Sequence, residues 1–176
     1  MLSLNFTMKG NSIPHQIKDG CLEIPHYVKA IPAGAFAGCQ EVYRCDFPTG
    51  LRTIEESAFS CCANLQEVHF PSTLKEIGGH AFSSCNLKEL VVPSSVTYIG
   101  ACAFAACAEL AEVEILGKPL IESKAFADCP KLYLVRLKDS YETISLKAFD
   151  KEPSTRLKNV PIAFHTPNGI RIRKYD

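Results

Sequence analysis

A unit of 22 or 23 residues recurs along this chain. Phenylalanine stands at positions 36, 59, 82, 104, 126 and 149, so the successive intervals are 23, 23, 22, 22 and 23 residues. Alanine precedes each of these phenylalanines, and isoleucine stands five residues before each. Cysteine stands three residues after the first five of them, at Cys39, Cys62, Cys85, Cys107 and Cys129. A fixed period in the low twenties predicts a stacked solenoid, in which equivalent side chains form columns.

The second unit shows most clearly how one coil is built. Val68 and Phe70 alternate with polar residues, which is typical of a strand with one buried face. Pro71 has no N–H group and is expected to end this strand. Residues 74–77 then run back on the other side of the coil, and residues 80–84 are predicted to form a short helical turn that buries the repeated phenylalanine.

The units occupy the middle of the chain and leave a different pattern at each end. Residues 1–20 are predicted to cap the first coil, with alternating Leu2, Leu4 and Phe6 as a capping strand. Residues 21–160 form the predicted solenoid of about six repeats. Residues 161–176 are predicted to be the C-terminal cap, because a turn sequence at 166–169 lies between two alternating apolar segments, as in a hairpin.

Composition narrows the classes of function. A length of 176 residues with 47% hydrophobic content suits one domain with a continuous core. A formal net charge of zero argues against nucleic acid as the partner. No apolar run reaches 18 residues, so no membrane span is expected. The first 20 residues lack the basic start and apolar stretch of a secretion signal, which leaves a cytoplasmic location open.

The nine cysteines have neither metal-site nor redox-motif spacing. Five of them belong to the repeat and are interpreted as small buried side chains with free thiols. Cys45 stands at a predicted core position, whereas Cys21, Cys61 and Cys102 lie off the pattern. The sequence also contains no phosphate-binding loop and none of the hydrolase or metalloprotease motifs. We therefore expect neither catalysis nor a cofactor.

The unit resembles the BspA-like, or Treponema pallidum-type, leucine-rich repeat. The resemblance rests on the pattern L-x-x-V-x-F-P-x-x-L-x-x-I-G-x-x-A-F-x-x-C at residues 65–85 and covers roughly residues 21–160. It implies an α/β repeat solenoid, coiled right-handedly, with a parallel sheet on the concave side and short strands or helical turns on the convex side. Members of this family are mostly surface proteins that bind other proteins, and the family has no catalytic residues.

Residues that alternate with the buried strand positions form the candidate binding face. They are Arg44, Asp46, Glu67, His69, Glu89, Val91, Glu112, Glu114, Tyr133 and Arg136. Glu67, Glu89 and Glu112 occupy the same position in three successive strands, where like charges repel one another. One interpretation is an acidic stripe kept for a partner with a basic surface. The other is a solvated face on which Arg44 and Lys88 relieve the repulsion.

Three functions remain open on this basis. The first is a non-catalytic protein-binding module, such as a fragment of an adhesin, which acts as a monomer and binds a protein on the concave face. The second is a structural spacer or assembly unit within a larger surface protein. The third is a cytosolic, thiol-rich regulatory protein, which the cysteine count and the missing signal favour.

Overall fold

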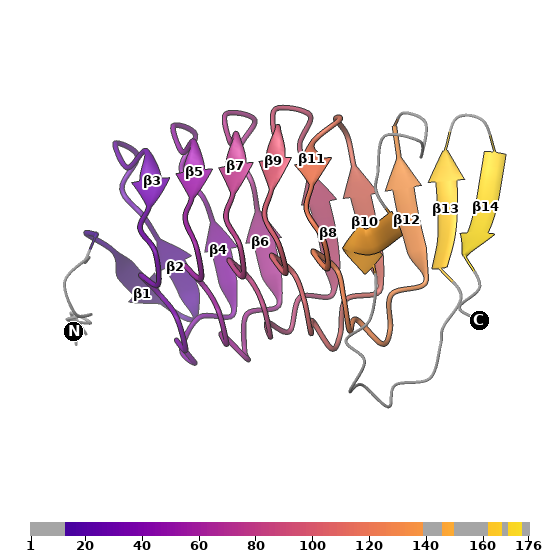
Figure 1. The fold of residues 1–176 in the computed structure, drawn as a ribbon. Coiled ribbons are helices and arrows are strands. Elements are labelled where there is room, and N and C mark those ends of the chain that lie inside the picture. The colour runs from indigo at the N-terminus through magenta and orange to yellow at the C-terminus, as the bar shows by residue number, and fades with distance from the viewer. Residues whose placement is uncertain (1–12, 139–145, 150–161, 167–168, 174–176) are drawn as a thin grey trace.

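The chain folds into a row of stacked coils with β-strands along two sides (Figure 1). The structure is a computed structural model that describes residues 13–138, 146–149, 162–166 and 169–173. It confirms the repeat solenoid. The predicted capping strand at residues 2–6 lies outside the described residues.

One side of the stack is built from the longer strands, which we call the wide sheet. Its parallel strands are β2 (Cys21–Glu23), β4 (Arg44–Asp46), β6 (Glu67–His69), β8 (Glu89–Val92), β10 (Glu112–Ile115), β12 (Leu134–Leu137) and β13 (Ile162–Thr166). An antiparallel strand closes each end, namely β1 (Gln16–Lys18) beside β2 and β14 (Gly169–Arg173) beside β13. The predicted C-terminal hairpin is therefore present, and its first strand also extends the wide sheet.

The hydrogen-bond ladder of the wide sheet is interrupted between β6 and β8. The strand order is β1-β2-β4-β6 in one part and β8-β10-β12-β13-β14 in the other. The interruption coincides with a shortened unit, because Cys85 and Leu87 are two positions apart where the other units have a spacing of three. Asn86 and Lys88 still donate their N–H groups to carbonyls of the preceding coil, at 3.1 and 3.3 Å.

The other side of the stack is a narrow sheet of two-residue strands in register. Its strands are β3 (Ala30–Ile31), β5 (Thr53–Ile54), β7 (Glu76–Ile77), β9 (Tyr98–Ile99) and β11 (Leu120–Ile121). The second residue of each strand is the repeated isoleucine, which points into the core and is buried. These are the short strands that were expected on this side.

Between the two sheets, the repeated phenylalanines form one continuous column. Successive rings from Phe36 to Phe149 lie nearly parallel, with centroids 5.0, 5.2, 5.4, 5.3 and 5.3 Å apart. All six rings are buried. At the N-terminal end, the imidazole of His15 packs edge-on against Phe36 at 5.0 Å and so covers the last ring.

The structure does not confirm the predicted helical turns. It therefore does not confirm the α/β class either. In residues 80–84, His80 and Ser84 have φ values of 55° and 57°, in the left-handed region that ends a right-handed helix. The N–H groups of His80, Phe82 and Ser84 instead donate to carbonyls of the next coil at 3.0, 2.7 and 2.8 Å. The described residues contain a single helix, the 3₁₀ helix η2 (Leu146–Phe149).

The same two left-handed positions recur two residues before and two residues after each of the first five repeated phenylalanines, from Phe36 to Phe126. The first coil fills both with glycine, Gly34 and Gly38, whereas later coils use side-chain-bearing residues. Left-handed backbone costs an ordinary residue roughly 1–2 kcal/mol. The later coils therefore hold strained turns, which the hydrogen bonds between coils keep in place.

Ala106 provides a test of this strain, because it is exposed and has a φ of 57°. We expect Ala106→Gly to raise the free energy of unfolding by about 0.5–1 kcal/mol, since glycine adopts this conformation without a steric penalty. Urea denaturation measures the change. Ala105→Gly, at a neighbouring residue outside the left-handed positions, is the control and should destabilise. A stability loss in both variants would contradict the assignment of strain.

All nine cysteines are free thiols. The sequence led us to expect this of the five repeat cysteines and left Cys21, Cys61 and Cys102 open. Four of the five repeat cysteines are buried and Cys129 is half-buried. The thiols of Cys62, Cys85, Cys107 and Cys129 lie 3.0–3.3 Å from the carbonyl oxygen of the phenylalanine one coil earlier, to which they donate. The repeat cysteine therefore fills a small core position and also satisfies a buried carbonyl.

Candidate functional site

The outer face of the wide sheet carries all ten predicted site residues. Their strands alternate as expected, because Cys45, Val68 and Leu90 point inward and are buried while the residues beside them face outward. None of the ten is buried. The structure thus brings the predicted residues together on one surface, and their role in binding stays a prediction.

At the N-terminal end of this face, four charged or ionisable residues form one group, which we call the Asp46 cluster: Arg44, Asp46, Glu67 and His69. Arg44 donates to both carboxylate oxygens of Asp46, and the shortest contact is 2.8 Å. His69 lies between two acids, with Nδ1 against Asp46 and Nε2 3.0 Å from Glu67. Partial burial raises the pKa of Asp46, but the hydrogen bonds from Arg44 and His69 outweigh it, so this pKa lies below its usual value.

The lowered pKa of Asp46 predicts a pH-dependent contribution to stability. Because the pKa is depressed in the folded state, the contribution is present above the unfolded value of about 4 and is lost as the pH falls through the folded value. We expect Asp46→Asn to lower the free energy of unfolding by less than about 1 kcal/mol at pH 7, since the group is half exposed.

Urea denaturation at pH 7 and at pH 2.5 measures this contribution. The difference between wild type and Asp46→Asn should be smaller at pH 2.5. Glu89→Gln is the control, because no ion pair or hydrogen bond in the described chain engages the Glu89 carboxylate, and it should have an effect below about 0.5 kcal/mol at both pH values. An equal effect of Asp46→Asn at the two pH values would contradict the ion-pair argument.

At the C-terminal end of the face, Glu112, Tyr133 and Arg136 form a second group, the Glu112 cluster. The Tyr133 hydroxyl and the Arg136 guanidinium both donate to the Glu112 carboxylate. The hydrogen bond from Tyr133, followed by that from Arg136, lowers the pKa of Glu112, and the same bond raises the pKa of Tyr133. This carboxylate is therefore already neutralised within the chain.

The predicted acidic stripe is consequently uneven. Glu89 and Glu112 are direct neighbours in the ladder, but Glu67 and Glu89 lie on opposite sides of its interruption. Glu67 has His69 as a partner and Glu112 has Tyr133 and Arg136, whereas no ion pair in the described chain engages Glu89. Arg44 is bound to Asp46 rather than to the stripe.

Large apolar side chains are exposed among these charges. Tyr43, Val91 and Tyr133 are 49%, 49% and 46% exposed. Tyr43 precedes β4 and lies over the turn between β1 and β2, where a Cβ atom added at Gly20 would come within 2.6 Å of the ring. Tyr43 was not among the predicted site residues, although it occupies the same repeat position as Tyr133 and could have been found from that spacing.

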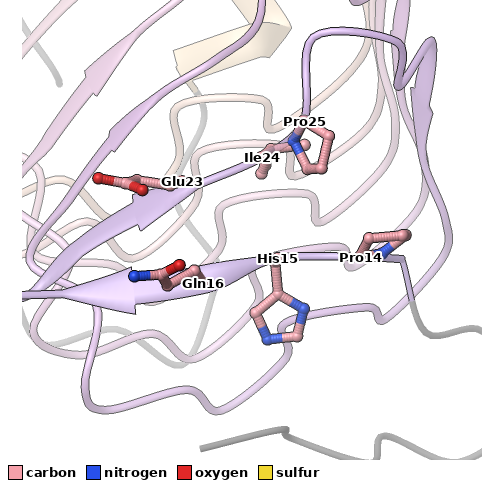
Figure 2. Close-up of a pocket in the computed structure, with 6 residues that line it drawn as sticks. All are labelled: Pro14, His15, Gln16, Glu23, Ile24 and Pro25. Carbon is pink, nitrogen blue, oxygen red and sulfur yellow. The ribbon is translucent and has the colours of Figure 1, made fainter. Parts of the chain in front are cut away.

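A pocket of about 370 Å³ lies at the N-terminal end of the stack (Figure 2). It is lined by Pro14, His15, Gln16, Glu23, Ile24 and Pro25, at the start of β1 and the end of β2. His15 Nδ1 donates to the Ile13 carbonyl at 2.9 Å, and its Nε2 is buried without a partner among the described residues. The sequence did not single out this region.

The described residues contain no group of three or more histidine, cysteine, aspartate or glutamate residues that could hold a metal ion. Nor do they contain a helix whose length and apolar character would let it cross a membrane.

The fold is that of a leucine-rich-repeat solenoid. Its coils are short, their parallel strands lie in register on two sides, and the repeated phenylalanines form a continuous column. The chain belongs to the family described as BspA type leucine rich repeat region, whose model matches six copies over residues 29–156. The resemblance stated from the sequence is thereby confirmed. No curated protein is significantly similar in sequence.

Solved structures share this fold. A leucine-rich repeat protein of T. pallidum is 28% identical, with a TM-score of 0.62 over 71% of this chain and 68% of its own. A leucine-rich cell surface protein of Faecalibacterium prausnitzii is 28% identical, with a TM-score of 0.68 over 72% of this chain. A Bacteroides ovatus leucine-rich repeat protein, 22% identical with a TM-score of 0.62 over 82% of this chain, shows the fold alone. The chain spans 34% of the F. prausnitzii protein and 38% of the B. ovatus protein.

Proposed function

We propose that the chain is a non-catalytic protein-interaction module that binds its partner through the outer face of the wide sheet, the face that the family resemblance predicts to be concave. One observation carries this proposal. Five large apolar side chains are exposed in the described part of the chain, and three of them, Tyr43, Val91 and Tyr133, lie on this face among charged residues. Tyrosine is enriched in protein–protein interfaces relative to the rest of the protein surface.

The wider setting of this module is also a proposal. One similar structure is named as a leucine-rich cell surface protein. We propose that the chain acts at a cell surface as an adhesin-like fragment, because it is similar to that protein and because members of the family bind other proteins. The extended faces that solenoids present to their ligands support this placement.

Affinity capture with a matched pair of variants tests the proposal. The first variant, Tyr43→Ser/Tyr133→Ser, alters the outer face of the wide sheet. The control, Tyr27→Ser/Leu120→Ser, removes two apolar side chains elsewhere on the surface that are more exposed than the two tyrosines. Proteins retained by wild type and by the control, but lost from the first variant, are the expected result in mass spectrometry. Equal retention by all three proteins would contradict binding through this face.

A thiol-rich regulatory protein is the second candidate, because all nine thiols are free. Burial counts against it: desolvation raises the pKa of Cys45 well above its usual value, and the hydrogen bond with Cys107, together with burial, does the same for Cys129. Titration of the native protein with a thiol reagent separates the two functions. We expect exposed Cys61 to react first and the buried repeat cysteines to react only after denaturation. Rapid reaction of most of the nine would favour the regulatory role.

A structural spacer is the third possibility, which the partial coverage of longer relatives keeps open. The antiparallel strands β1 and β14 end the parallel ladder, and polar segments that cap the ends of a solenoid oppose end-to-end stacking of copies. Sedimentation measures this directly: a monomer is the expected result, and concentration-dependent filaments would favour the spacer.

A further inference from the structure

We infer that the centre of the wide sheet's outer face docks a basic, extended segment of a partner protein. In this arrangement, lysine or arginine side chains lay their aliphatic stems on Val91 and direct their charged ends to Glu89 and Glu114. The inference rests on the proposed function and specifies the chemistry of the partner.

Val91 is exceptional in its column of equivalent positions. The column, from β2 to β12, consists of Glu23, Asp46, His69, Val91, Glu114 and Arg136. Val91 is its single apolar member and is 49% exposed. An exposed valine between charged residues offers apolar surface that the aliphatic stem of a basic side chain can cover.

The two carboxylates beside Val91 differ from the other acids nearby. Glu114 lies directly opposite Val91 in the ladder, and Glu89 lies two residues before it on the same strand. Within residues 13–138 and the other described segments, neither carboxylate takes part in a hydrogen bond or an ion pair. Asp46, Glu67 and Glu112, by contrast, are engaged by partners of the chain itself.

The spacing of these groups suits a long basic side chain. Neighbouring strands lie about 4.8 Å apart, and residues i and i+2 of one strand about 6.6 Å apart. A lysine or arginine stem can cover the valine while its charged end reaches a carboxylate on either side. In an extended segment, alternate side chains on one face recur at the same interval of about 6.6 Å, so a second basic residue can reach the other carboxylate.

The charge of this face from β1 to β12 favours this partner over a second copy of the chain. Its acidic residues are Glu23, Asp46, Glu67, Glu89, Glu112 and Glu114, and its basic residues are Lys18, Arg44, Lys88 and Arg136. Six acids against four bases leave an excess of two negative charges (6 − 4 = 2) with the histidine neutral. Two such faces would repel each other, whereas a basic segment is attracted.

Binding of synthetic peptides to the full chain tests the inference. The probe is a fluorescent nonapeptide of alternating lysine and valine, and its affinity is measured by anisotropy. Lysine–serine and glutamate–valine nonapeptides report whether the charge and the apolar groups are both required. We expect Glu89→Gln/Glu114→Gln to weaken binding of the lysine–valine peptide about fivefold or more, and Val91→Ser to weaken it as well.

The control variant is Glu56→Gln/Glu76→Gln, which removes two exposed carboxylates away from this face and matches the charge change. It should leave peptide affinity within about twofold of wild type. Equal losses of affinity in both double variants would overturn the inference, because general charge alone would then explain binding. Binding of the lysine–serine peptide as tightly as the lysine–valine peptide would overturn it for the same reason. Failure of wild type to bind the lysine–valine peptide would also overturn it. Protein capture that depends on Tyr43 and Tyr133 would in that case still support the proposed function.

Discussion

Replacing Phe82 with alanine should lower the free energy of unfolding by about 3–5 kcal/mol, the usual loss for a core aromatic side chain. The ring is fully buried and stacks between Phe59 at 5.2 Å and Phe104 at 5.4 Å. Phe47 and Phe70 add edge contacts at 6.4 and 5.6 Å. Loss of this ring leaves a cavity in the middle of the column, where both neighbouring coils are held by their own hydrogen bonds and cannot collapse into it.

Urea denaturation followed by circular dichroism measures this loss. Phe82→Leu is the matched control, because it keeps most of the apolar volume, and its loss should be clearly smaller than that of Phe82→Ala. An unchanged denaturation midpoint for Phe82→Ala would mean that the ring does not lie in the core.

The second large effect is expected at Gly100, where an added side chain would clash with the backbone of the neighbouring coil. A Cβ atom at this position would lie 2.4 Å from the backbone nitrogen of Gly79 and 2.8 Å from the carbonyl carbon of Gly78. Because these are backbone atoms of a paired coil, no side chain can rotate to make room. We expect Gly100→Ala to cost roughly 2–3 kcal/mol, in the upper part of the range for overpacking.

Gly79→Ala is the control for this position. Its added Cβ would meet the Ala101 carbonyl oxygen at 3.3 Å, a tight contact that a small shift relieves. Thermal unfolding of both variants should show a clearly larger fall in melting temperature for Gly100→Ala. Equal falls would indicate that loss of glycine flexibility, rather than the close approach of the coils, limits substitution.

Much of the fold was predictable because a solenoid repeats the same environment in each coil. The period placed phenylalanine, isoleucine and cysteine in buried columns, and alternation placed the predicted site residues on one outer face. The turns were not predicted correctly, because Ala106, Ser84 and His80 do not individually indicate left-handed backbone. The sequence indicated this backbone only in the first coil, where Gly34 and Gly38 occupy the two left-handed positions that other residues occupy in later coils.

The site was predictable in position and less so in detail. Alternation decides which face a side chain occupies, but it does not decide which charges pair. Arg44 pairs with Asp46 on its own strand and does not relieve the repulsion among the three glutamates. Glu112 accepts hydrogen bonds from Tyr133 and Arg136, whereas Glu89 has no such partner in the described chain. His15 also escaped prediction as the cover of the phenylalanine column, although it stands 21 residues before Phe36, close to one period.

The interruption between β6 and β8 has a mechanical consequence. One wall of the stack, the narrow sheet, runs through this point without a break, whereas the opposite wall is joined there by the N–H groups of Asn86 and Lys88. A solenoid in which one sheet is continuous and the other is interrupted bends most easily at the interruption. When its two ends are pulled or twisted, the molecule should therefore yield there first, beside Glu89 and Val91, and its two halves should tilt as separate stiff segments.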